Sequence, residues 1–298
     1  MRITTLLLLA SLLLFSCTKR DITVNQTHTN ETVDGNIAPP FNGVSTLQVQ
    51  NFINKAFIDL RGREPIQQEM EQAVLLLEGN DLNDEAKEAL LNFLIADASY
   101  FLRFWDKYSA AMLEGITRQE VAGNVYQYQV ALEQAILQGD EIVISFIEIE
   151  LNKLQNLLDA LPYYVQGEID INGYMARIIN NAIYDEINMG SENFTIATFE
   201  NLFKRSPTVD ELEASRLMIN GFSTQFLFED GNSKDDVVEI FTSVPEFYQG
   251  LVFDIYNQLL SRDPDSQEMS EMTEILIENR DYQEIQKMVM KSYEYAGF

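Results

Sequence analysis

The stretch FENLFKRSPTVDEL, residues 199–212, carries the pattern that decides the fold of this chain. The pattern reads aromatic-x2-Leu-x2-Arg-x-Pro-x3-Glu-[Leu/Met]. It recurs without a gap as FIDLRGREPIQQEM at residues 57–70 and as YNQLLSRDPDSQEM at residues 256–269. Self-similarity of this kind is the sequence signature of a repeated supersecondary unit. The sequence therefore predicts three copies of one structural unit.

The columns of the pattern predict a helix, a break and a second helix. The aromatic residue and the Leu lie three positions apart, on one face of a helix that ends near the Arg. The Pro disfavours helical backbone at the residue before it. Thr208 and Asp265 then cap the next helix in the second and third copies, each with a Glu three positions later. Ile66 occupies this position in the first copy and predicts a weaker helix start.

The repeated polar residues are the candidate site residues of the folded part. They are Arg63, Pro65 and Glu69 in the first copy, Arg205, Pro207 and Glu211 in the second, and Arg262, Pro264 and Glu268 in the third. We expect each Arg to bind helix-end carbonyls or a nearby carboxylate. Contact with a ligand or partner is the alternative for the same residues.

An acidic loop follows the second helix of each copy, at residues 78–81, 229–232 and 278–281. These loops lack the Gly and the ligand spacing of a calcium-binding loop, so we expect helix caps and no metal site. The predicted fold is all-α, with three helical repeat units around a longer helical insert. The units span residues 47–101, 191–249 and 250–298, and the insert spans residues 102–190, with an amphipathic helix running to about Ala160.

Composition excludes several classes of protein. The 298 residues hold 20 Lys and Arg against 47 Asp and Glu, a formal net charge of −27, which disfavours binding to nucleic acids. One Cys and one His exclude an internal disulfide and make Ser-His-Asp triads, Cys-His dyads and zinc sites implausible. No catalytic residue and no cofactor is predicted. Paired carboxylates carry almost no information in so acidic a chain.

The N-terminus resembles a bacterial lipoprotein signal peptide. Residues 6–15 form an apolar segment too short to span a bilayer, and Leu14-Phe15-Ser16-Cys17 resembles a lipobox. This resemblance implies a signal peptide at residues 1–16, lipidation of Cys17 and anchoring through lipid alone. Residues 17–46 then read as a flexible tether that contains His28. The outer membrane is the expected location, in the manner of Bacteroidetes lipoproteins, with its periplasmic and cell-surface faces both open.

The repeated pattern also resembles two bacterial families. With the closing Ser292-Tyr293-Glu294-Tyr295, it is similar to a domain of unknown function of bacterial surface proteins that is related to phycobilisome linkers. The first copy is also similar to a planctomycete-type domain of unknown function that is often fused to cytochrome c. Neither resemblance implies catalytic residues.

From these features we expect a non-catalytic lipoprotein that binds or scaffolds other envelope proteins at the outer membrane. A glycan-binding accessory protein or a carboxylate-based hydrolase at the cell surface is the alternative.

Overall fold

A computed structural model describes residues 43–298. The predicted signal peptide, the lipidation site Cys17 and nearly all of the predicted tether lie outside the described residues. The all-α prediction is confirmed for the described part, whose only strands are two segments of three residues each. Among residues 43–298, no helix combines the length and the apolarity that a bilayer span requires.

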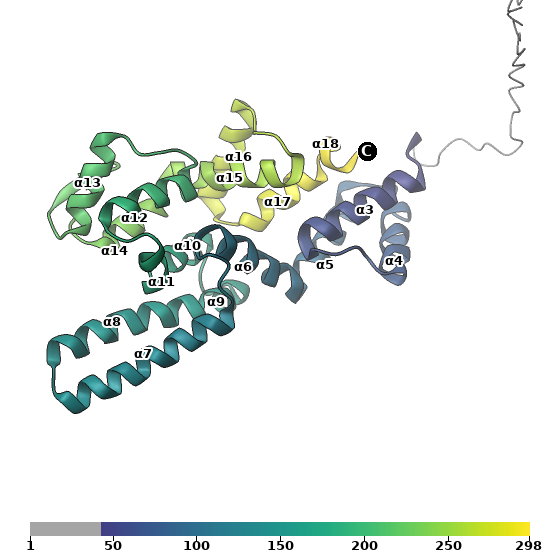
Figure 1. The fold of residues 1–298 in the computed structure, drawn as a ribbon. Coiled ribbons are helices and arrows are strands. Elements are labelled where there is room, and N and C mark those ends of the chain that lie inside the picture. The colour runs from purple at the N-terminus through teal and green to yellow at the C-terminus, as the bar shows by residue number, and fades with distance from the viewer. Residues whose placement is uncertain (1–42) are drawn as a thin grey trace, which may run out of the picture. The chain divides into compact units, whose positions relative to one another are not determined.

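The segments of the three predicted copies contain the following helices in chain order (Figure 1). The first copy contains α3 (Thr46–Arg61), α4 (Gln67–Glu78) and α5 (Asp84–Ile95). The second contains α12 (Ser191–Thr198), the π-helical turn η2 (Phe199–Phe203), α13 (Val209–Ile219) and α14 (Lys234–Phe241). The third contains α15 (Pro245–Leu260), α16 (Ser266–Asn279), α17 (Tyr282–Lys291) and α18 (Tyr293–Ala296).

Local side chains explain where these helices begin. The predicted capping boxes form at Thr208 with Glu211 and at Asp265 with Glu268. Ile66 offers no side-chain acceptor, yet the Glu69 carboxylate still accepts the Ile66 backbone N–H at 2.9 Å. The start of α4 therefore keeps half of the capping box.

The insert consists of helices that differ in detail from those expected. They are α6 (Ala98–Met112), α7 (Arg118–Gln138), α8 (Glu141–Leu158), α9 (Ala160–Gln166), α10 (Ile171–Ile179) and α11 (Ala182–Ile187). The amphipathic helix expected to run to about Ala160 is α8, which ends at Leu158. Pro162 lies in the first turn of the next helix, α9, where its missing N–H costs nothing. The side chain of Asn181 caps α11, which separates α10 from α11.

Two further expectations need correction. The predicted boundaries at 101/102 and 249/250 fall inside α6 and α15, because the closing motif of a copy starts a new helix. The second acidic loop is a β-hairpin, with β1 (Thr224–Phe226) antiparallel to β2 (Glu229–Gly231). Leu227 and Phe228 form its turn with φ of 51° and 71°, a conformation that usually selects Asn or Gly.

Aromatic side chains build the core where the insert meets the third copy. The ring of Phe104 on α6 lies 4.9–5.4 Å from the rings of Tyr108, Tyr164, Tyr174 and Tyr282. These spacings are typical of favourable aromatic pairs. Helix α6 is therefore fastened both to the insert and to α17.

The first and third copies also pack against each other. The Glu88 carboxylate on α5 pairs with Lys291 at 2.8 Å and with Lys287 at 3.7 Å, both on α17. The Tyr295 hydroxyl donates to the Asp59 carboxylate at 2.6 Å, and α18 contacts α3. Segments from the two ends of the described chain thus lie side by side (Figure 1).

Candidate functional site

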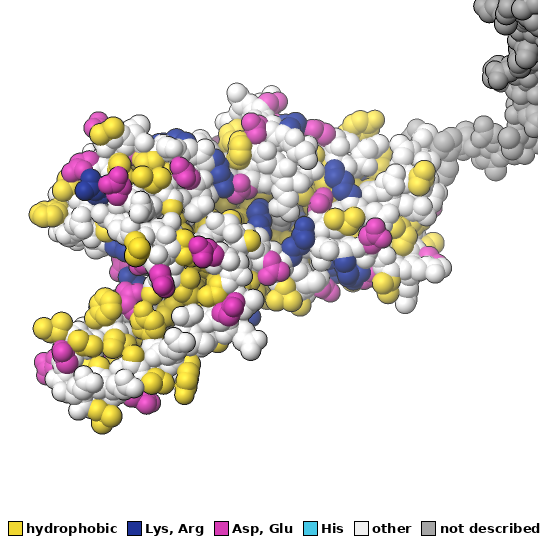
Figure 2. Space-filling view, viewed as in Figure 1, with side chains coloured by type: hydrophobic (Ala, Val, Ile, Leu, Met, Phe, Trp, Pro, Cys, Tyr) yellow, Lys and Arg dark blue, Asp and Glu magenta, His cyan; other side chains and the backbone are white. Residues whose placement is uncertain are grey.

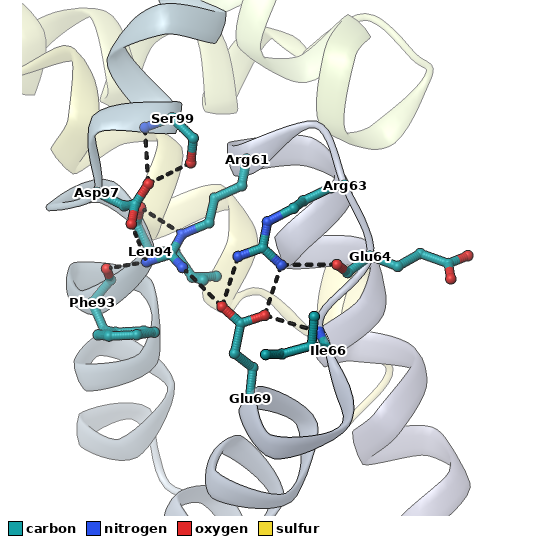
Figure 3. Close-up of polar contacts among 9 residues, drawn as sticks. All are labelled: Arg61, Arg63, Glu64, Ile66, Glu69, Phe93, Leu94, Asp97 and Ser99. Carbon is teal, nitrogen blue, oxygen red and sulfur yellow. Dashed lines mark hydrogen bonds and ion pairs between the residues drawn. The ribbon is translucent and has the colours of Figure 1, made fainter.

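The repeated Arg and Glu of each copy form a clamp across the break between two helices. In the first copy, both terminal nitrogens of Arg63 reach the Glu69 carboxylate at 2.7 Å, and Arg63 also donates to the Glu64 carbonyl (Figure 3). Arg205–Glu211 and Arg262–Glu268 repeat this two-bond geometry at 2.7–2.8 Å. Paired bonds of this kind fix the geometry of both side chains.

A second glutamate completes the clamp in two of the copies. Arg205 also binds Glu246 at 2.5 and 2.9 Å, and Arg262 binds Glu294 at 2.8 and 2.6 Å. Both glutamates come from the closing motif, far along the chain from the Arg. With a backbone carbonyl added, every N–H of these two guanidinium groups has an acceptor.

The first copy joins its helices differently. Ser99 stands where the other copies have the second Glu, and its backbone and side chain bind Asp97. Arg61, where the other copies have Phe203 and Leu260, is buried and donates to the carbonyls of Phe93 and Leu94 at 2.8 and 3.3 Å (Figure 3). In the first copy, Arg61 therefore takes the role that the second glutamate has in the other copies, which is to connect the helices.

Hydrogen bonds from the clamp arginines lower the pKa of Glu211, Glu268 and Glu294. The bonds from Arg205 lower the pKa of Glu211 to about 2, and Arg262 lowers the pKa of Glu268 and Glu294. Each guanidinium is partnered inside its own copy, and those of the second and third copies have no N–H left for a ligand. The geometry therefore favours helix fastening over ligand contact for Arg205 and Arg262.

A different surface, the hairpin of α7 and α8, exposes apolar side chains. Leu137 is 87% exposed, Ile142 84% and Phe146 62%, and Tyr126 and Ile149 are also exposed. Ile142, Phe146 and Ile149 are spaced four and three apart, so they form one stripe of α8. Figure 2 shows hydrophobic side chains gathered over this hairpin. We call the α8 stripe of Ile142, Phe146 and Ile149 the hairpin face.

The charges that flank the hairpin face along the chain are mostly negative. Between Tyr126 and Ile149 they are Glu133, Asp140, Glu141 and Glu148, and the next cation along α8, Lys153, pairs with Asp235 at 3.5 Å. Only the base of the hairpin is packed into the unit, through residues such as Val121, Leu154 and Leu157. Exposed apolar patches of this kind mark interaction sites in soluble domains.

The sequence of α8 contains a signal for this surface beside its amphipathic pattern. One face of the helix is buried or half-buried and consists of Ile144, Ile147, Leu151, Leu154 and Leu158. Apolar residues also occupy the opposite side of the same helix, at Ile142, Phe146 and Ile149. A helix that is apolar on more than one face needs more than one packing partner.

A pocket of about 440 Å³ lies where the first copy, α6 and the third copy meet. Helix α6 supplies five of its ten lining residues. The lining residues are Asp59 and Leu60 from α3, Tyr100, Arg103, Phe104, Asp106 and Lys107 from α6, Gln258 from α15, and Tyr282 and Gln286 from α17. We call this the junction pocket. Figure 2 shows Lys and Arg side chains on the surface near α6, α15 and α17.

Comparisons of the chain with protein-family models, with curated proteins and with solved structures found no match. Within residues 43–298, no group of three or more His, Cys, Asp or Glu side chains is placed to hold a metal ion. The candidate functional surfaces are therefore defined by this chain's own geometry: the hairpin face and the junction pocket.

Proposed function

We propose that this chain is a non-catalytic cell-envelope lipoprotein that binds or scaffolds a partner protein at the outer membrane. The hairpin face carries the proposal, because an exposed apolar surface on a hairpin anchored only at its base is suited to docking. The signal-peptide-like N-terminus and the lipobox Cys17 support the location.

The chemistry of the hairpin face selects the kind of partner. Its flanking acids would repel an anionic membrane surface, and a second copy of the same face would bring like charges together. A basic amphipathic helix complements both properties, because its apolar side fits the α8 stripe and its cations meet the acids. The proposed partner is therefore an envelope protein that presents such a helix.

Peptide binding tests the hairpin face directly. A labelled Leu/Lys amphipathic helical peptide should bind the purified protein in fluorescence polarisation, and a Leu/Glu peptide of the same pattern should not. Replacing Ile142 and Phe146 by Ser should weaken binding at least tenfold. Leu75→Ser, which removes an equally exposed apolar residue from α4, should leave binding unchanged. Equal loss in both variants, or equal binding of both peptides, would reject the proposed surface.

Fractionation tests the anchor separately. Cys17→Ser should move the protein from the membrane fraction to the soluble fraction, because the acyl chains would supply the membrane affinity. A Cys17→Ser protein that stays in the membrane would contradict lipid anchoring and leave the peptide result unaffected.

The hydrolase alternative draws on one observation. Two acids, Asp59 and Asp106, line the junction pocket, and burial raises the pKa of Asp59. Glycoside hydrolysis uses a pair of carboxyl groups, one of which acts as an acid with a raised pKa. However, the Asp59 carboxylate already accepts the Tyr295 hydroxyl at 2.6 Å. We therefore favour binding over hydrolysis at this pocket.

A further inference from the structure

We propose that the junction pocket binds a small organic carboxylate, a ligand with one negative charge on a ring. This site is separate from the hairpin face and does not depend on the proposed partner. Its volume of about 440 Å³ falls within the range of about 300–1,000 Å³ that is typical of small-molecule sites.

Within the described residues, two cations of the pocket have no carboxylate partner. No Asp or Glu carboxylate oxygen there lies within 4.0 Å of a side-chain nitrogen of Arg103 or Lys107. Most other Lys and Arg side chains in the described part of this acidic chain do form such pairs. Two unpaired cations on one turn of α6 are therefore available to an oxyanion.

Backbone geometry holds the guanidinium of Arg103 in place. Its Nε donates to the Asp59 carbonyl at 3.1 Å, which leaves both terminal nitrogens without a partner among the described residues. Gly62 makes room for this placement, since a Cβ there would lie 2.8 Å from Nη1 of Arg103. The same glycine has a φ of 72° and caps α3, so one residue serves both the helix end and the pocket.

The amides of the pocket present donors as well. Lys107 Nζ can only donate, and it donates to the Gln258 amide oxygen at 2.9 Å and to the Tyr282 hydroxyl at 3.1 Å, which leaves one of its N–H groups for a ligand. The Gln258 NH₂ group then has no partner among the described residues. The Tyr100 hydroxyl donates to the oxygen of buried Gln286 at 2.6 Å, which leaves that NH₂ group free too. The unused polar groups are thus mostly hydrogen-bond donors, which suits a ligand rich in acceptors.

The acids of the pocket limit the ligand's charge. Asp59 and Asp106 balance Arg103 and Lys107, so the lining is close to neutral when all four are ionised. A dianion such as a phosphate ester would face two carboxylates, whereas a carboxylate can pair with Arg103 alone. Leu60, Tyr100 and Phe104 supply the apolar wall for its body.

Calorimetric titration of the full protein tests this site with named probes. The probes are galacturonate, glucuronate and benzoate, with galactose as the neutral control and inorganic phosphate as the dianionic control. At least one carboxylate should bind with a Kd below about 1 mM, and galactose and phosphate should bind at least tenfold more weakly. Arg103→Gln and Lys107→Met should each weaken carboxylate binding at least tenfold.

Arg177→Gln is the matched control, because Arg177 lies on α10 outside the pocket and also lacks a carboxylate partner among the described residues. It should bind like the wild type, as should the double Ser variant of the hairpin face. The proposal is overturned if no carboxylate binds, if phosphate binds best, or if both pocket variants bind normally while folded by circular dichroism. Turnover of an aryl glycoside that Asp59→Asn abolishes would replace it with the hydrolase alternative.

Discussion

Glu211 serves two purposes with one carboxylate. It accepts the Thr208 backbone N–H at 2.7 Å, which completes the capping box of α13. It also accepts two bonds from Arg205, which secures the break before the helix. The cap could be predicted from residue spacing alone, because its atoms lie within four residues of one another. The contact between Arg205 and Glu211 could not be predicted from spacing alone, because it depends on the turn at Lys204, whose φ is 60°.

This double role predicts a pH dependence. The folded-state pKa of Glu211 is lowered to about 2, below its unfolded value of about 4.3, so its contribution is present above that unfolded value. The contribution is lost as the pH falls toward about 2. At pH 7, Glu211→Gln should lower the free energy of unfolding by about 1 kcal/mol, because the pair is only partly buried.

Urea unfolding at pH 7, 4.5 and 2.5 measures the effect. The difference between wild type and Glu211→Gln should shrink as the pH falls. Glu274→Gln serves as the control, since Glu274 is exposed and makes no polar side-chain contact among the described residues. A difference that is constant over this pH range would mean that the Arg205 pair does not contribute to stability.

The tightest glycine contact among the described residues lies where α15 crosses the end of the first helix of the second copy. A Cβ at Gly250 would lie 1.8 Å from the Leu202 carbonyl oxygen, so only glycine fits this crossing. Leu202 belongs to η2, a wider π-helical turn. Nothing in the local sequence marks Gly250 as special, because the atoms that require it lie 48 positions away.

Replacing this glycine should therefore be costly. Gly250→Ala should lower the free energy of unfolding by about 2–3 kcal/mol, because the added methyl group meets backbone that cannot rotate away. Gly123→Ala is the matched control, since Gly123 lies in α7 with open space where the methyl group of an alanine would lie. The control should gain up to about 1 kcal/mol from helix propensity. Chemical denaturation measures the free energy of unfolding of both variants. Equal changes in the two variants would contradict the close contact between Gly250 and Leu202.

At the scale of the whole described unit, the last helix, α18, packs against the first helix, α3. Tyr295 and Phe298 pack edge-on against Phe52 of α3, with ring centroids 6.1 and 5.6 Å apart. Burial raises the pKa of the Tyr295 hydroxyl, which stays protonated and donates to Asp59. These contacts predict that the first and third copies, which contain α3 and α18, unfold together rather than separately.

Tyr295→Ala should lower the free energy of unfolding by about 3 kcal/mol, because it removes a buried aromatic side chain and a hydrogen bond. Trp105, the single tryptophan, lies on α6 and reports on the insert. In the wild type and in Tyr295→Ala, the Trp105 fluorescence and the far-ultraviolet circular dichroism should show coincident unfolding transitions. Tyr293→Ala, which alters an exposed neighbour, should change stability by less than about 0.5 kcal/mol. Separate transitions would indicate independently folding copies.

The sequence by itself determined the helical class, the breaks at Pro65, Pro207 and Pro264, and the capping boxes. These features depend on backbone sterics and on hydrogen bonds between residues within a few positions of one another. They are therefore readable from a repeated pattern of fourteen residues.

Tertiary structure alone decided which surfaces are available for function. The second glutamates of the clamps lie 41 and 32 residues from their arginines, and the junction pocket draws on four helices. The apolar residues of α8 divide between core and solvent according to what packs beside the helix. Burial and long-range pairing depend on the packing of distant segments, so the hairpin face and the unpaired cations of the pocket became visible only in the folded chain.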